Sequence, residues 1–332
     1  MDYKDVFKAF QGGKKFLITS HIYLDGDAIA SELVVAKILR LMGKEPLIVN
    51  EHSVPRFLQF LPKSEDLKTY SEGIDYEFDT AVVLDIGAWK RMGLVSNIID
   101  RNKHHIINID HHRSNDRVGD CVLIEANASS TGEILYHLLK ENSFEIDKET
   151  AFLLYAAILT DTGRFTYDNT TATTLRIAAD LLDTGIDAQK IANEVYRSIT
   201  DAQLELQSRA LSRLGITDDR KIAWITLYWK DFEETGEGPD DTQEFAEFPR
   251  SIAGVVVGMY IRELADGRVK VSMRSNGGID LNEFAMRYGG GGHKSAAGIT
   301  FSKMDIQTVT KFVVQEISKE LEGNTKRREP SA

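Results

Sequence analysis

The 332-residue chain has almost no cysteine, no long apolar run and no excess of positive charge. Its one cysteine, Cys121, excludes an intramolecular disulfide framework and suits a reducing cytoplasm. No apolar run approaches the ~20 residues that a membrane-spanning helix requires. The amino-terminal stretch is charged and lacks the apolar core of a signal peptide. These absences together predict a cytoplasmic protein with no membrane partner.

The net charge of -11 argues against a broad basic surface for duplex DNA. It does not argue against a small phosphorylated substrate, because carboxylates that hold metal ions are counted as negative in this sum. A site with two divalent ions would bring about four positive charges back to the place where the substrate binds. The acidic balance therefore disfavours long polyanions but permits small phosphates.

The length of the chain favours two domains, because it exceeds the usual size of one hydrophobic core. Short apolar runs at 15–20, 46–50, 80–85 and 105–110 indicate buried parallel strands. Between the first two, residues 28–42 carry apolar side chains at helical spacing. Strand, helix and strand in this order predict an α/β domain with a doubly wound parallel sheet and flanking helices.

The second half of the chain changes character twice. Helices are predicted at 131–142, 148–161 and 170–185, followed by more polar helices at 188–199 and 201–214. Strand patterns then occur at 221–228, 252–264 and 268–275, with helices predicted at 280–289 and about 306–321. We therefore predict a first domain over 1–185, a helical connector over 186–214 and a smaller α+β domain over 215–325.

Acids and histidines gather in the sequence HIYLDGD, which directly follows the first predicted strand. His21, Asp25 and Asp27 offer imidazole nitrogen together with carboxylate oxygen, a ligand set that suits Mn²⁺, Fe²⁺, Co²⁺ or Zn²⁺ better than Ca²⁺. Gly26 allows the backbone to turn between the two acids. The alternative interpretation is that Asp27 caps the following helix and His21 ends a strand by chance.

Further segments place similar residues at the ends of predicted elements. Asp85 ends one strand, Asp110-His111-His112 ends another, and Asp161 ends an apolar helix. Each Asp alone could be a turn residue, whereas two adjacent histidines after an acid are costly to bury without a function. Open α/β sheets build their sites at the carboxyl ends of strands. The side chains are therefore predicted to converge on a pair of cations ~3.5–4 Å apart that activates water and clamps a phosphoryl oxygen.

A glycine run at 289–292 precedes His293 in the second domain. Consecutive glycines expose backbone N–H groups and allow an anion to approach closely, although such a run could also be a hinge. Arg274 ends a predicted strand just upstream, and its guanidinium suits bidentate phosphate contact. Exposed arginines at strand ends are common, so Arg274 alone is only suggestive.

These segments resemble a known family. HIYLDGDAIAS, VVLDIG, DHH and LTDTGRFTY are similar to the motifs of the DHH phosphoesterases, and VSMRS with GGGGHKSAAG resembles their DHHA1 domain. The resemblance covers about 5–320 and is strongest to bacterial nanoRNase/pAp phosphatases, which degrade very short oligonucleotides and 3′-phosphoadenosine 5′-phosphate (pAp). Leu24 stands where the first motif usually has proline, a position that ligates nothing.

The resemblance implies two divalent metal ions, most simply Mn²⁺, with Asp85 as the bridge. The first ion would be held by His21, Asp25 and Asp85, and the second by Asp27, Asp85, His111 and Asp161. Asp110 would orient its neighbours, and His112 would lie beside the substrate phosphate as a donor or proton carrier, so that the catalytic set is His112, Asp85 and Asp110. The implied substrate-binding residues belong to the DHHA1 domain: Arg274, Ser275, Gly290, Gly291, Gly292 and His293.

The activity implied is hydrolysis of short oligoribonucleotides to mononucleotides and of pAp to AMP, by attack of a metal-bridging hydroxide. The nearest alternative is a phosphodiesterase for cyclic di-AMP and its linear product pApA. A manganese pyrophosphatase or polyphosphatase is more distant, since those carry different second domains. A RecJ-like exonuclease should carry more positive charge. A non-catalytic nucleotide-binding regulator should have lost ligands, yet every expected ligand type is present. A homodimer is compatible with this class of enzyme.

Overall fold

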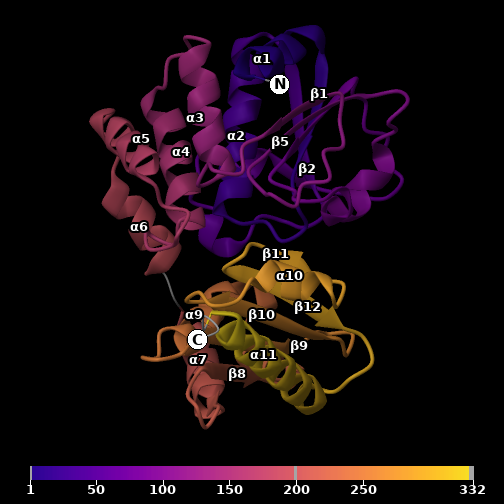
Figure 1. Ribbon diagram of the computed structural model, residues 1–332. Helices are drawn as coiled ribbons and strands as arrows, with labels where there is room; N and C mark the ends of the chain where they lie inside the picture. The colour runs from indigo at the N-terminus through magenta and orange to yellow at the C-terminus, as the bar shows by residue number, and fades with distance from the viewer. Residues whose placement is uncertain (1, 198–199, 329–332) are drawn as a thin grey trace. The chain divides into compact units, whose positions relative to one another are not determined.

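The computed structural model describes residues 2–197 and 200–328 (Figure 1). The chain divides into two compact units, Met1–Ser198 and Ile199–Ala332. This boundary falls inside the predicted connector: α6 (Ala188–Tyr196) belongs to unit 1, and α7 (Asp201–Ser212) belongs to unit 2. Within the described part of the chain, no helix combines the length and the apolar character that crossing a membrane requires.

Unit 1 is built on a six-stranded parallel sheet in the order β3-β2-β1-β4-β5-β6. Its strands are β1 (Lys15–Thr19), β2 (Glu45–Asn50), β3 (Leu67–Thr69), β4 (Thr80–Leu84), β5 (His105–Asp110) and β6 (Cys121–Ile124). The predicted parallel sheet is confirmed, whereas the two outermost strands were missed because they are too short to give an apolar run. The direction of winding reverses between β1 and β4, where open sheets of this kind form a crevice.

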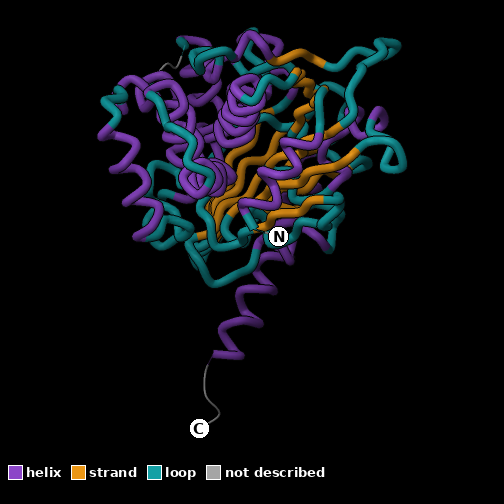
Figure 2. Tube along the Cα trace, turned by 90° about the horizontal axis from the view of Figure 1, so that it is seen from above, coloured by secondary structure: helices purple, strands orange, loops and turns teal. Residues whose placement is uncertain are grey.

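The helices and 3₁₀ segments of unit 1 cover the sheet on both faces. They are α1 (Tyr3–Gly12), α2 (Gly26–Leu41), α3 (Thr131–Glu141), α4 (Lys148–Asp161), α5 (Ala172–Asp183), α6, η1 (Arg56–Leu58), η2 (Ser64–Asp66) and η3 (Trp89–Ile98). Alternate strand residues point to opposite faces, so Phe16 and Ile18 pack with the α-helices, while Leu17 packs on the side of η3. Figure 2 shows strands in orange and helices in purple. Burial of both faces explains why the strands are apolar throughout.

The start of α4 depends on one carboxylate. Asp147 accepts hydrogen bonds from the Thr150 N–H at 2.9 Å and from Lys37 Nζ at 2.8 Å. Partial burial raises the pKa of Asp147, but the Lys37 ammonium and Thr150 overcome this effect and hold it at about 2. Because the folded pKa is depressed, this stabilisation is present above the usual value of 3.8 and is lost as pH falls toward 2.

Replacing Asp147 by alanine is expected to lower the free energy of unfolding at pH 7 by about 1 kcal/mol through loss of the helix cap. Asp147→Asn keeps a capping oxygen but removes the charge that pairs with Lys37. The asparagine variant should therefore lose less free energy of unfolding than the alanine variant at pH 7. This loss should shrink as pH falls from 4 toward 2. Urea unfolding followed by circular dichroism checks both, and equal stability of all forms at pH 7 would contradict the prediction.

Unit 2 contains a smaller mixed sheet in the order β11-β12-β10-β9-β8-β7. Its strands are β7 (Gly215–Ile216), β8 (Ile222–Leu227), β9 (Val257–Glu263), β10 (Val269–Ser275), β11 (Gly291–Gly292) and β12 (Ala296–Phe301). Its helical elements are α7, α8 (Trp229–Thr235), η4 (Pro239–Ala246), α9 (Glu247–Arg250), α10 (Leu281–Met286) and α11 (Ile306–Arg328). The predicted α+β domain is confirmed. The strand predicted from 252 begins later because Gly254, with φ of 88°, forms a turn there.

Candidate metal centre

The predicted acids and histidines of unit 1 do come together. His21 follows β1, Asp85 follows β4 and Asp110 ends β5, so these three lie at the carboxyl ends of adjacent parallel strands. Asp161 is the last residue of α4, and Asp27 lies in the first turn of α2. The convergence follows from topology, because β1, β4 and β5 are neighbours in the sheet although they are far apart in the sequence.

Asp85 is the centre of this group. Its Oδ2 lies 3.4 Å from His21 Nε2, and its Oδ1 lies 3.3 Å from His111 Nε2. The backbone of Asp85 has φ of 55°, in the left-handed region that few residues other than glycine adopt. Such strain persists where the surrounding structure requires it and often marks a functional site. Each carboxylate oxygen thus faces a different histidine, which is the arrangement that a bridging ligand needs.

Asp27 and Asp161 complete the second half of the cluster. Asp27 is fully buried, and its two oxygens accept hydrogen bonds from the N–H groups of Thr131 at 2.7 Å and Gly132 at 2.9 Å. These N–H groups open α3, whose positive end favours a carboxylate. Asp161 Oδ2 lies 3.4 Å from His111 Nε2. The helix cap assigned to Asp27 in the alternative interpretation belongs instead to Asp25, which accepts from the Ala28 N–H at 3.0 Å.

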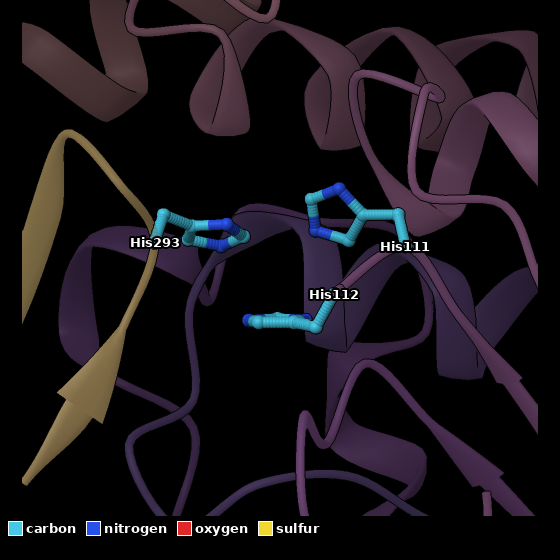
Figure 3. A group of neighbouring side chains, drawn as sticks. All are labelled: His111, His112 and His293. Carbon is cyan, nitrogen blue, oxygen red and sulfur yellow. The ribbon is translucent and has the colours of Figure 1, made fainter. Parts of the chain in front are cut away.

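Asp110 and His112 form a hydrogen-bonded pair. His112 Nδ1 lies 2.7 Å from Asp110 Oδ1, and the His112 N–H donates to the same oxygen at 2.9 Å. The other oxygen of Asp110 accepts from the Gly87 N–H at 2.7 Å and from Asn115 Nδ2 at 2.5 Å. The rings of His111 and His112 meet edge to face, with centroids 4.8 Å apart (Figure 3). Asp110 is therefore saturated by its neighbours and holds the His112 ring in place.

Burial and crowding shift the pKa values of the cluster strongly. Burial, together with the charges of Asp85 and Asp161, raises the pKa of Asp27 well above its usual range. Burial also raises the pKa of Asp161 to about 7, opposed by His111. Burial alone would lower the pKa of His21, but the Asp25 and Asp85 carboxylates raise it to about 9. These buried carboxylates repel one another, and a cation placed among them would stabilise their ionised forms.

Several residues around the cluster were not predicted from the sequence. Asn115 supports Asp110, and Thr131 donates from Oγ1 to Asp85 at 3.3 Å. Arg91, on η3, places Nη1 3.3 Å from His112 Nε2. Nothing in hydrophobic periodicity distinguishes such residues from ordinary surface polar groups. The one signal that could have indicated these residues is a position close in sequence to an Asp at a strand end. Arg91, for example, lies a few positions after Asp85.

Glu32 is a buried acid of α2 behind His21. Its Oε2 accepts a hydrogen bond from Asn50 Nδ2 at 2.8 Å. Asn50 Oδ1 in turn accepts from the Ser20 N–H at 3.1 Å and from Thr19 Oγ1 at 3.3 Å. Burial raises the pKa of Glu32 to about 8, although the hydrogen bond from Asn50 and the nearby Ser20 hydroxyl oppose this. The network links α2 and β2 to the end of β1, where the first metal-ligand candidate lies.

Replacing Glu32 by glutamine is expected to make the protein more stable at pH 8.5 than the natural chain. An acid whose folded pKa is raised stabilises the fold fully below its usual value, here 4.5, and this contribution is lost as pH rises through about 8. Between pH 5 and 8.5, the variant should gain ~4 kcal/mol relative to the natural chain. Urea unfolding at both pH values measures this, with the exposed Glu72→Gln as control. An equal difference at both pH values would contradict it.

In unit 2, the predicted substrate-binding residues already have partners. Arg274 Nε lies 3.2 Å from Glu247 Oε1, and Arg250 Nη2 lies 2.6 Å from Glu247 Oε2. Ser275 Oγ exchanges hydrogen bonds with the backbone of Gly277, accepting from its N–H at 2.9 Å. Two arginines thus share one carboxylate, which leaves a net positive charge at the end of β10.

The glycine run serves packing as well as exposure. A Cβ on Gly290 would lie 2.1 Å from the Gly298 carbonyl oxygen, and one on Gly292 would lie 2.4 Å from that of Ala296. The N–H of Gly290 donates to Ala285 O at 2.9 Å, and the N–H of Gly292 donates to Asn282 Oδ1 at 3.1 Å. Both N–H groups therefore have partners within the chain. The run holds β11 against β12, and the His293 side chain follows it, drawn with two histidines of unit 1 in Figure 3.

Comparisons with known proteins decide the family. The family described as "DHH family, N-terminal domain" matches residues 15–158, and the one described as "DHHA1 domain" matches residues 222–319. The chain belongs to the DHH family. Its two matched segments lie in unit 1 and unit 2, respectively, so each family domain corresponds to one folded unit.

Named relatives and a solved structure cover nearly the whole chain. The bifunctional oligoribonuclease and PAP phosphatase NrnA of Thermus thermophilus is 31% identical over 318 residues, 96% of this chain and 93% of its own. The Bacillus subtilis protein of the same name is 26% identical and covers 87% of this chain and 90% of its own. An exopolyphosphatase-related protein from Bacteroides fragilis has a TM-score of 0.86 and 28% identity, over 98% of each chain.

Proposed function

We propose that this protein is a metal-dependent phosphoesterase that hydrolyses short oligoribonucleotides to mononucleotides and pAp to AMP. The observation that carries the proposal is the convergence of buried acids and histidines around Asp85 at the carboxyl ends of β1, β4 and β5. Family membership supports phosphoester hydrolysis, and the near full-length similarity to proteins named bifunctional oligoribonuclease and PAP phosphatase supports these substrates.

The residues present fit a pair of divalent cations. His21, Asp25 and Asp85 offer ligand atoms within 4.8 Å of one another, and so do Asp27, His111 and Asp161. Oδ2 of Asp161 is buried and has no hydrogen-bond partner among the residues that the structure describes. Mixed nitrogen and oxygen donors favour Mn²⁺ over Ca²⁺. The first group would hold one Mn²⁺ and the second group the other, and Asp85 would offer an oxygen to each.

The chain's own residues have separate tasks in this reaction. When bound, the metal ions lower the pKa of water and neutralise charge on a phosphoryl oxygen. Asp110 holds His112 through Nδ1 and thereby orients its Nε2, the atom proposed to face the substrate phosphate. The residues of unit 2 proposed to contact the remainder of the substrate are Arg274, Ser275, Gly290, Gly291, Gly292 and His293.

A product assay separates this function from its rivals. The purified protein with Mn²⁺ is incubated in parallel with pAp, pApA, a 5-mer RNA, cyclic di-AMP and polyphosphate. Release of AMP from pAp and of mononucleotides from the 5-mer is the expected result. Turnover of only cyclic di-AMP and pApA would replace the proposal by a cyclic dinucleotide phosphodiesterase. Absence of turnover for every compound would favour a nucleotide-binding protein without catalysis.

Location and assembly complete the proposal. The single thiol, Cys121, is free and buried, which supports a reducing cytoplasm. The net charge of -11 supports small nucleotide substrates rather than duplex DNA. A homodimer is proposed for the assembled enzyme. Light scattering during gel filtration tests it, and a mass of 37.2 kDa at micromolar concentration would show a monomer instead.

A further inference from the structure

Arg91 is fastened to the candidate metal centre by the backbone. Its carbonyl oxygen accepts a hydrogen bond from the Ile22 N–H at 2.8 Å, so η3 is joined to the residue that follows His21. Gly93, with φ of 60°, makes the turn next to it, and a Cβ there would lie 2.5 Å from the Ile22 side chain. The fold therefore holds the Arg91 main chain beside the first motif with no help from a ligand.

The guanidinium of Arg91 lies in an acidic site without pairing with an acid. Among residues 2–197, which the structure describes, no carboxylate forms an ion pair or a hydrogen bond with Arg91. The guanidinium instead places Nη1 3.3 Å from His112 Nε2. Arginines beside carboxylates normally form ion pairs with them. A guanidinium that pairs with no carboxylate here is open to an anion that the chain does not supply.

The contact with His112 shows what that partner must be. Asp110 accepts from His112 Nδ1, and a guanidinium can only donate, so His112 Nε2 is the acceptor toward Arg91 when the ring is neutral. The guanidinium keeps further N–H donors beside this contact. An anionic oxygen accepts from such donors, as a phosphoryl oxygen would.

We propose that Arg91 is a further catalytic residue, whose guanidinium binds a non-bridging oxygen of the substrate phosphoryl group together with His112. This inference rests on the proposed function and extends it, because it places a phosphate-binding cation within unit 1 itself. Arginine suits this task since its planar fork binds phosphate in a bidentate manner and stays charged at every working pH. Charge that develops on the phosphoryl oxygens during hydrolysis would be stabilised by it.

Turnover of pAp by variants tests the proposal. Arg91→Ala should lower kcat/KM by ~10²- to 10³-fold, as removal of a donor to developing charge does. Arg91→Lys should recover activity only in part, because an ammonium keeps the charge but not the fork. Bound Mn²⁺ per chain, measured by mass spectrometry of the metal, should stay unchanged in both. Arg176→Ala, an exposed arginine of α5, is the control that should behave as the natural chain.

A binding measurement separates phosphate contact from mere support of His112. Calorimetric titration of the Mn²⁺-loaded protein with inorganic phosphate should show ~10-fold weaker binding for Arg91→Ala, a loss of about 1.4 kcal/mol. Unchanged phosphate binding with reduced kcat would overturn the proposal and leave Arg91 a positioning residue, and unchanged activity would also overturn it. Because phosphate binding needs no turnover, this titration tests Arg91 even if the natural chain hydrolyses none of the nucleotides. Absence of hydrolysis would contradict only the proposed function.

Discussion

Replacing Asp85 by asparagine is expected to lower the turnover of pAp by ~10³-fold or more. The side chain lies between His21 and His111, with one oxygen toward each, so it is the acid that we propose would bridge the two cations. Burial raises the pKa of Asp85, but hydrogen bonds from His111, His112 and His21 overcome this and hold it well below its usual range. The charge that asparagine removes is therefore present at every working pH.

The same substitution should leave the fold intact. Asparagine has nearly the volume of aspartate, and Thr131 Oγ1 can still donate to its amide oxygen. Removing the charge also relieves the repulsion that Asp27 and Asp161 feel from Asp85. Circular dichroism should be unchanged, while bound Mn²⁺ should fall. Asp75→Asn, an exposed acid of unit 1, is the matched control. A variant at Asp85 that keeps more than a tenth of the natural activity would refute the bridging role.

Chelation of the metal ions is the second large effect that we expect. Dialysis against EDTA should reduce hydrolysis of pAp to background, and Mn²⁺, but not Ca²⁺, should restore it, because the ligand set includes imidazole nitrogens. Without cations, the buried carboxylates of Asp27, Asp85 and Asp161 repel one another. If cations bind this preformed cluster but not the unfolded chain, as we propose, Mn²⁺ at 100 times its Kd should add about 2.7 kcal/mol of stability.

Thermal unfolding of the EDTA-treated protein measures this second effect. Addition of Mn²⁺ should raise Tm by ~5–10 °C, because about 1 kcal/mol of added stability corresponds to 2–4 °C for a domain of the size of unit 1. Because ligands must lose their protons, the rise should be smaller at pH 5.5 than at pH 8. The Asp85→Asn variant should show little of it. Full activity after exhaustive chelation, or an equal rise in the variant, would rule out the proposed centre.

Much of unit 1 could be predicted from the sequence because its signals are local. The apolar runs at 15–20, 80–85 and 105–110 became β1, β4 and β5, since strands buried on both faces need uninterrupted apolar residues. Parallel strands bring their carboxyl ends to one sheet edge. The residues just after those runs are His21, Asp85 and the Asp110 to His112 segment, and they were therefore expected at the same edge of the sheet.

The outer strands and the linker region were harder to predict for equally local reasons. β3 has only polar or intermediate positions, and β6 is four residues long, so neither presents a pattern that differs from a loop. The predicted connector at 186–214 has helical periodicity, but periodicity does not show which unit a helix packs against. Tertiary contacts assign α6 to unit 1 and α7 to unit 2.

The sequence by itself determined the α/β class of unit 1, the α+β class of unit 2 and the residues that meet around Asp85. Only the tertiary structure decided what surrounds them. Asp25 rather than Asp27 caps α2, and the Ile22–Arg91 backbone hydrogen bond brings a guanidinium to His112. The reason is physical: periodicity and strand ends are properties of neighbouring residues. The partner of a buried polar group is instead set by strand order and by turns such as Gly93, where distant segments meet.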